Sequence, residues 1–88
     1  MAVPGFNTDI YHQQAHFHIQ TEDWGEDNPQ IVTRIFKNGA VLKSVKIPYN
    51  ILYLKRNYLD YSKVLRSQMK SQHDQCVQQI QAERPVSL

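Results

Sequence analysis

Apolar and polar residues alternate along the first part of the chain with the period of two that a half-buried β-strand shows. Two such segments run over residues 8–12 and 16–22. We expect a two-residue turn at Gln14-Ala15 to join them, which places Ile10 opposite Ile19. This register gathers the apolar side chains on one face of the hairpin and leaves the other face polar, with His18, Gln20 and Glu22.

A second pair of alternating segments, residues 30–37 and 40–47, flanks Asn38-Gly39. This dipeptide favours a type I′ hairpin turn because both residues tolerate the positive φ angles that the turn requires. The implied register pairs Phe36 with Val41. It gives both faces aliphatic residues, namely Val32, Phe36, Val41, Val45 and Ile47 on one face, and Ile31, Ile35, Ala40 and Leu42 on the other. Since one helix cannot cover both faces, we expect a neighbouring chain or element to cover the rest, or some of it to stay exposed as a binding site.

A helical pattern follows Pro48, with Asn50 as its expected N-cap. The stripe recurs every three or four residues and contains Ile51, Leu54, Tyr58, Tyr61, Leu65, Met69, His73, Cys76 and Ile80. No Gly or Pro interrupts it, and Pro85 ends it near residue 83. The sequence therefore predicts an α+β fold within a single domain, residues 1–88: a four-stranded antiparallel sheet of two hairpins over residues 6–48, followed by one long C-terminal α-helix over residues 50–83.

The predicted helix is about twice as long as the sheet, since it would span roughly 45–50 Å against about 23 Å for a seven-residue strand. Its distal half, residues 68–81, carries six glutamines and few apolar residues. We therefore expect this half to pair with a second copy, which makes a homodimer, or to dock on a partner protein. The predicted contact residues are Ile31, Ile35 and Leu42 of the sheet and Leu65, Met69, Cys76 and Ile80 of the helix.

Charge is sorted along the chain, although the formal net charge is only +2. Residues 1–33 carry −5, residues 34–70 carry +8 and the remainder carries −1. The acidic segment could fold against the basic one, or the basic segment could meet an acidic protein partner or a phosphate backbone. Tyrosines between the basic residues suit nucleic acid, which is the alternative function. The predicted basic patch consists of Lys55, Arg56, Lys63, Arg66 and Lys70.

Catalytic and metal-binding patterns are weak in this sequence. His16 and His18 share one strand face at a spacing that metal sites use, but a site needs three or four converging ligands, so a metal-binding protein is the less favoured alternative. Cys76 and His73 have an i, i+3 spacing that could activate a thiol, yet no third group accompanies them. The three glycines are isolated and form no phosphate loop. We expect neither an enzyme nor a bound cofactor.

Composition limits the class of protein further. No apolar run approaches the length of a membrane span, and residues 1–5 lack the pattern of a secretory signal. The single cysteine cannot form an internal disulfide, which agrees with a reducing compartment. We therefore expect a cytoplasmic protein with no membrane partner.

Residues 17–49 carry a resemblance to a known family. They contain the strand end Phe17-His18-Ile19-Gln20-Thr21-Glu22-Asp23, then Asn28-Pro29-Gln30-Ile31-Val32-Thr33, Phe36, Asn38-Gly39 and Lys43-Ser44. This run resembles a small, uncharacterised bacterial family with a His-x-Gln-Thr-Glu-Asp strand end and an Asn-Gly hairpin. The resemblance implies a bacterial, intracellular protein and supplies no activity. The pattern as a whole favours a small non-enzymatic adaptor or regulatory protein that binds another protein.

Overall fold

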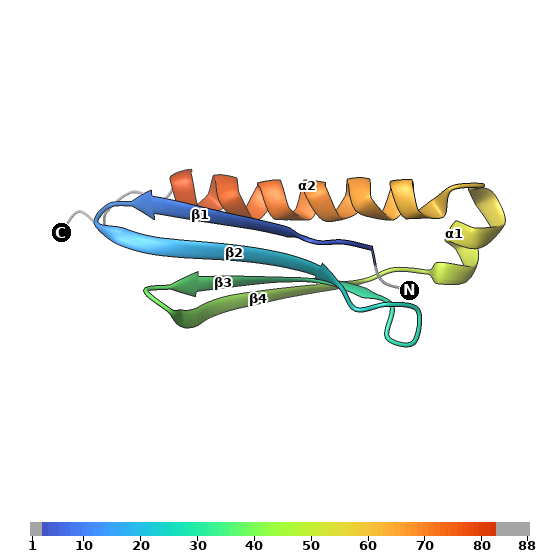
Figure 1. The fold of residues 1–88 in the computed structure, drawn as a ribbon, viewed down its shortest axis with the longest axis horizontal. Coiled ribbons are helices and arrows are strands. Elements are labelled where there is room, and N and C mark those ends of the chain that lie inside the picture. Colours follow the sequence, from blue (N-terminus) through green and yellow to red (C-terminus); the bar gives the residue numbers. More distant parts are fainter. Residues whose placement is uncertain (1–2, 83–88) are drawn as a thin grey trace.

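A computed structural model describes residues 3–82 and confirms the α+β fold. The strands are β1 (Phe6–His12), β2 (Ala15–Asp23), β3 (Gln30–Lys37) and β4 (Ala40–Pro48), and the helices are α1 (Ile51–Asn57) and α2 (Tyr61–Ala82). The strands form one antiparallel sheet in the order β1-β2-β3-β4. The sheet and α2 run side by side, and α1 lies at one end of an elongated molecule of 52 × 20 × 19 Å (Figure 1). No helix in the described residues is both long enough and apolar enough to cross a membrane.

The first hairpin turns one residue earlier than predicted. Gln13 and Gln14 form the turn with φ angles of 51° and 66°, so Ile10 pairs with Phe17 instead of Ile19. The pairing thus differs from the predicted register by two residues. Because side chains alternate with a period of two, this difference leaves the apolar face intact.

The second hairpin confirms the turn and corrects most of the register. Asn38 and Gly39 have φ angles of 49° and 86°, and Phe36 pairs with Val41 as predicted. A β-bulge then shifts the pairing, so that Ile35 lies opposite Lys43 and Leu42 is the extra residue. As a result Val45 pairs with Thr33 and lies on the same face as α2, whereas the unbulged register had placed it beside Val32.

The predicted helix is divided into α1 and α2 by residues 58–60. Tyr58 donates its N–H to the Leu54 carbonyl at 3.0 Å but is itself extended, with φ −131°. Asp60 precedes α2, and its carboxylate accepts the Ser62 hydroxyl at 2.6 Å, which holds the pKa of Asp60 below its ordinary value. The 22 residues of α2 span about 33 Å, which is close to the roughly 30 Å of a nine-residue strand. The expectation of a helix twice as long as the sheet is therefore wrong.

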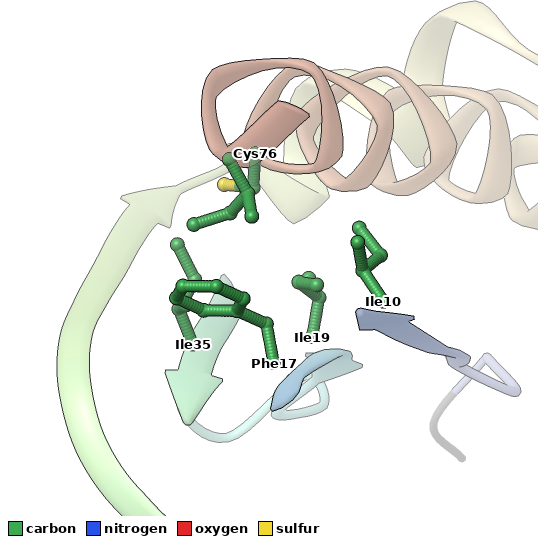
Figure 2. Close-up of a cluster of buried hydrophobic side chains, with 6 residues drawn as sticks. Ile10, Phe17, Ile19, Ile35 and Cys76 are labelled. Atoms are coloured by element: carbon green, nitrogen blue, oxygen red, sulfur yellow. The ribbon is translucent and has the colours of Figure 1, made fainter. Parts of the chain in front are cut away.

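The core lies between α2 and one face of the sheet, and its apolar part forms two clusters. The first cluster joins β1, β2 and β3 to the distal half of α2, with the strand side chains directed toward the helix (Figure 2). It consists of Ile10, Phe17, Ile19, Ile35, Cys76 and Ile80. The second cluster lies toward the start of α2 and consists of Ile31, Leu65 and Met69.

A buried polar layer joins α2 to three strands at Gln72 and His73, between the helix residues of the two clusters. The His73 ring hydrogen-bonds the Thr8 hydroxyl through Nε2 and the Thr21 hydroxyl through Nδ1, both at 2.8 Å. Thr21 contacts Thr33 at 2.7 Å, and the Gln72 amide donates to Thr33 at 3.0 Å. These bonds hold the glutamine-rich half of α2 against the chain's own sheet. The prediction that this half extends beyond the sheet is therefore wrong.

Candidate functional site

The predicted contact residues are mostly core residues. Six of the seven, namely Ile31, Ile35, Leu65, Met69, Cys76 and Ile80, are at most 4% exposed because α2 packs against the sheet there. Only Leu42, at the β-bulge, is 54% exposed. A partner cannot contact the other six while α2 stays in place, so any interaction surface must use different residues.

The predicted basic patch is divided between two parts of the molecule. Lys55 of α1 forms an ion pair with Glu26 of the acidic loop, residues 24–29 between β2 and β3, and this contact raises the pKa of Lys55 and lowers that of Glu26. The acidic segment therefore does fold against the basic segment at this point. Arg56 lies on α1 as well, where it borders a shallow pocket.

The other three residues of the predicted patch, Lys63, Arg66 and Lys70, line a shallow pocket of about 490 Å³ beside Phe6 of β1. Arg66 lies 4.2 Å from the centre of the Phe6 ring and donates to the Pro4 carbonyl. Lys70 pairs with Asp74 at 2.8 Å, and Lys63 lies 3.9 Å from Asp60. The cationic flank of α2 thus faces β1 and is partly neutralised within the chain.

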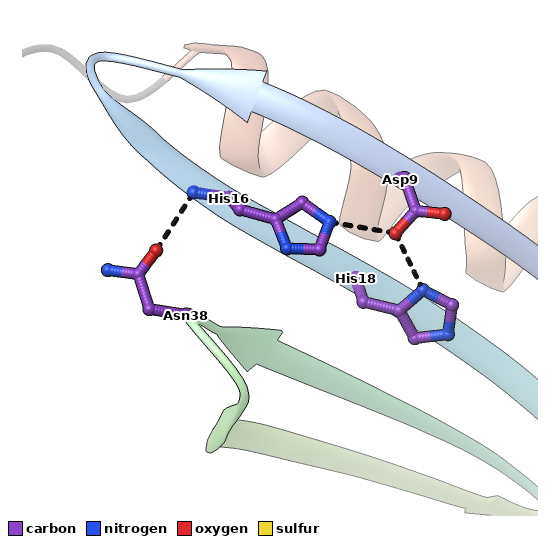
Figure 3. Close-up of polar contacts among 4 residues, drawn as sticks. All are labelled: Asp9, His16, His18 and Asn38. Atoms are coloured by element: carbon purple, nitrogen blue, oxygen red, sulfur yellow. Dashed lines mark hydrogen bonds and ion pairs between the residues drawn. The ribbon is translucent and has the colours of Figure 1, made fainter.

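His16 and His18 meet a third residue that we did not predict, Asp9 of β1 (Figure 3). One oxygen of Asp9 contacts His16 Nε2 at 2.8 Å and His18 Nδ1 at 3.0 Å, and the hydrogen bond from His18 is the main cause of the lowered pKa of Asp9. The alternation of residues 8–12 already places Asp9 on this face. Among residues 3–82, no group of three or more His, Cys, Asp or Glu side chains is arranged to hold a metal ion.

Cys76 and His73 do not form an activated thiol pair. Cys76 is 4% exposed, and burial raises the pKa of its thiol. Both ring nitrogens of His73 are engaged by Thr8 and Thr21, and burial lowers the pKa of the ring. A raised thiol pKa is the opposite of what a cysteine nucleophile needs.

No described helix packs against the sheet face opposite α2, here called the open face, although Val32 on this face is only 2% exposed. Its exposed or half-exposed side chains include aromatic rings, histidines and cations. Tyr11 stacks on His16 with ring centres 4.9 Å apart, and His18 lies 6.0 Å from Phe36. Trp24, which follows β2, lies between Arg34 at 5.7 Å and Lys46 at 5.1 Å. The open face thus presents rings at both of its ends.

A second exposed surface, here called the α1 surface, consists of Leu52, Tyr53, Tyr58 and Leu59. All four are exposed: Leu52 retains 74% of its accessible surface, and Leu59 is fully exposed. Tyr53 and Tyr58 meet edge to face with centres 6.4 Å apart. The predicted helical stripe placed Tyr58 among the apolar residues that face the core. Because the helix is broken at residues 58–60, Tyr58 and its neighbours are exposed instead.

The strand end over residues 18–23 has a structural role. The Asp23 carboxylate accepts the Val3 and Gly25 amides, each at 2.9 Å, and the Tyr49 hydroxyl at 2.6 Å. Burial, with this hydrogen bond, raises the pKa of Tyr49. Thr21 belongs to the buried polar layer, and Gln20 donates to Glu22. This segment therefore ties the N-terminal region, the acidic loop and the end of β4 together.

Comparisons of the chain with family models, with curated proteins and with solved structures found no match.

Proposed function

We propose that this protein is a small, non-enzymatic protein-binding module that contacts its partner through the α1 surface. The observation that carries this proposal is the group of four large apolar side chains, all exposed, within eight consecutive positions. Leu54 is the buried residue of α1, and Leu52 and Tyr53 contribute little to the chain's own core. Contiguous apolar residues on the surface of a small domain are typical of interaction sites.

The part of the α1 surface that lies on the helix is supported by contacts within the chain. The Asn50 side chain accepts the Tyr53 amide at 3.0 Å, and the Asn57 amide donates to the Tyr53 carbonyl at 2.8 Å. The Lys55–Glu26 ion pair joins α1 to the acidic loop. A preformed surface loses less conformational entropy on binding, which favours affinity.

The chemistry of this surface suits a partner that is both apolar and acidic. Leu52, Tyr53 and Arg56 border a shallow pocket of about 320 Å³ together with Asn50 and Asn57. Tyr and Arg are the residue types that most often dominate the binding energy of protein interfaces. An apolar partner side chain would occupy the pocket, and a carboxylate beside it would meet Arg56.

The proposal is tested by capture from cell extract followed by affinity measurement with the purified partner. The double variant Leu52→Ser/Leu59→Ser should lose the partner, with affinity reduced at least tenfold, because hot-spot truncations each cost more than about 1 kcal/mol. The control Val41→Ser/Leu42→Ser removes two exposed apolar side chains from β4 and should bind normally.

The oligomeric state must be measured in the same series. Light scattering gives 10.3 kDa for one chain and twice that for the predicted homodimer. If the wild type is a dimer that the α1 double variant separates, the partner on this surface is a second copy and the acidic-partner proposal is overturned. Equal capture by the wild type and the α1 double variant also contradicts the proposal.

A further inference from the structure

We infer that the open face binds single-stranded nucleic acid, with bases stacked on Tyr11, Phe36 and Trp24 and phosphates met by Arg34 and Lys46. This site is separate from the α1 surface, and neither site requires the other. It also differs from the basic segment of the helix that the sequence singled out, because Lys63, Arg66 and Lys70 belong to α2, which packs on the other face of the sheet.

Of the rings on the open face, Tyr11 is the most accessible for stacking, while Phe36 and Trp24 are half-buried. Tyr11 is 82% exposed, and its ring rests on the imidazole of His16, which leaves its other side to solvent. Phe36 lies on β3, two strands away from Tyr11 on β1, a separation of about 10 Å across the sheet. Unpaired bases stack on such rings irrespective of sequence, because every base has a flat π-face.

The two cations of the open face, Arg34 and Lys46, are gathered at its Trp24 end. Arg34 and Lys46 contact the Trp24 ring, and within residues 3–82 neither cation has an ion pair. The two acidic groups of this face balance these cations in formal charge, but Asp9 accepts from two histidines and Glu22 accepts from Gln20, and neither pairs with Arg34 or Lys46. The two cations therefore remain free to meet phosphates.

A row of polar side chains crosses the open face between the two groups of rings. Cross-strand pairing aligns Asn7 with Gln20, Gln20 with Arg34 and Arg34 with Ser44. Amides, a guanidinium and a hydroxyl can hydrogen-bond base edges, which are accessible only in an unpaired strand. An open antiparallel sheet with rings and cations on one face and a helix on the other suits a single strand better than a duplex.

Trp24 is the only tryptophan in the chain, so its fluorescence reports on this face alone. We expect homopolymers of about 12 nucleotides, within the ~4–16 that open-sheet domains occupy, to quench it at low salt. Tyr11→Ala should weaken binding roughly 5- to 150-fold, as loss of one base–aromatic stack does. The matched control Tyr53→Ala removes an exposed tyrosine of the α1 surface and should leave the affinity within twofold.

Salt dependence tests the cations separately. Arg34→Gln/Lys46→Gln should lower the slope of log affinity against log salt by about 1.4, since each phosphate contact on a single strand contributes about 0.7. Lys63→Gln/Lys70→Gln removes the same charge from α2 and should leave that slope nearly unchanged. RNA and DNA versions of each homopolymer show whether the 2′-hydroxyl contributes.

Three results would overturn the inference. One is the absence of any fluorescence change with every homopolymer at low salt. Another is an equal loss of affinity in Tyr11→Ala and Tyr53→Ala, or a loss confined to Lys63→Gln/Lys70→Gln. The last is quenching by a neutral polysaccharide but not by nucleic acid, which would assign the rings to sugar binding. None of these results depends on whether the α1 surface binds a protein.

Discussion

Replacing Gln72 with Ala should destabilise the protein far more than the same change at Gln79. Both residues are glutamines in the middle or distal part of α2, so the change in helix propensity is the same. Gln72 is 7% exposed and donates to Thr33 at 3.0 Å and to the carbonyls of Ile31 and Val45 at 3.3 Å. Gln79 is exposed. The comparison therefore isolates the buried contacts of one glutamine.

The expected magnitude follows from those contacts. The hydrogen bond to Thr33 contributes about 0.5–1.5 kcal/mol, the two longer bonds contribute less, and the buried methylene that Ala lacks contributes about 0.8 kcal/mol. The Thr33 hydroxyl keeps its bond to Thr21, so no buried hydroxyl is left without a partner. We expect a loss of about 2 kcal/mol, or roughly 8–16 °C in Tm for a domain of this size.

Urea unfolding followed by far-UV circular dichroism measures this difference. Gln79→Ala should lie within about 0.5 kcal/mol of the wild type, as exposed substitutions usually do. Equal midpoints for the two variants would refute the reasoning, because the distal half of α2 would then not be held by Gln72. If the m-value changes in Gln72→Ala and not in Gln79→Ala, the distal half of α2 is already detached in the native state of the Gln72→Ala variant.

Three further changes test other parts of the fold. Acidification below about pH 6.5 should lower the free energy of unfolding, because burial lowers the pKa of His73 and the unfolded chain then takes up a proton more readily than the native state. A His73→Leu variant should lose less stability than the wild type between neutral and mildly acidic pH, and an equal loss in the two proteins would contradict this. Gly5→Ala should lower the free energy of unfolding by about 1–3 kcal/mol, since the added Cβ would lie 2.2 Å from the Thr21 carbonyl oxygen. Asn7→Ala, at an exposed site, should leave it nearly unchanged, and thermal unfolding of the two variants measures the difference. Met69→Ala should cost about 2–5 kcal/mol in urea unfolding because Met69 is fully buried, and Met69→Leu, which conserves volume, less than about 1.5 kcal/mol; similar losses in the two variants would argue against a tightly packed second cluster.

The elements of the fold could be predicted from local patterns, while the exact pairing could not. Asn38-Gly39 has a strong conformational preference, and the structure has its turn there. Gln13-Gln14 has no such preference, so the first turn was misplaced by one residue. The bulge at Leu42 carries no glycine that would mark it. Asp60 did offer a signal, since aspartate is a favoured N-cap, but the unbroken apolar stripe around it indicated a continuous helix.

The site residues were harder to predict because exposure depends on which element covers which face. A stripe of Leu65, Met69 and Cys76 looks the same whether it meets the chain's own sheet or a second copy. Polar core residues add to this difficulty, since Gln72 and His73 acquire partners only when threonines from distant strands lie opposite them. The open face and the α1 surface follow from the placement of α2, which no local pattern specifies.

The placement of α2 also has a consequence for how the chain is made. All four strands precede α2 in the sequence, so they leave the ribosome before the helix that covers them. Until residues 61–82 emerge, the side chains of Ile10, Ile19 and Ile35 have no helix to pack against. Nascent chains with uncovered sheet surface are prone to aggregation. We therefore expect translation stalled before α2 to yield an insoluble nascent chain, and release of the stalled chain to depend on chaperones that hold apolar strands.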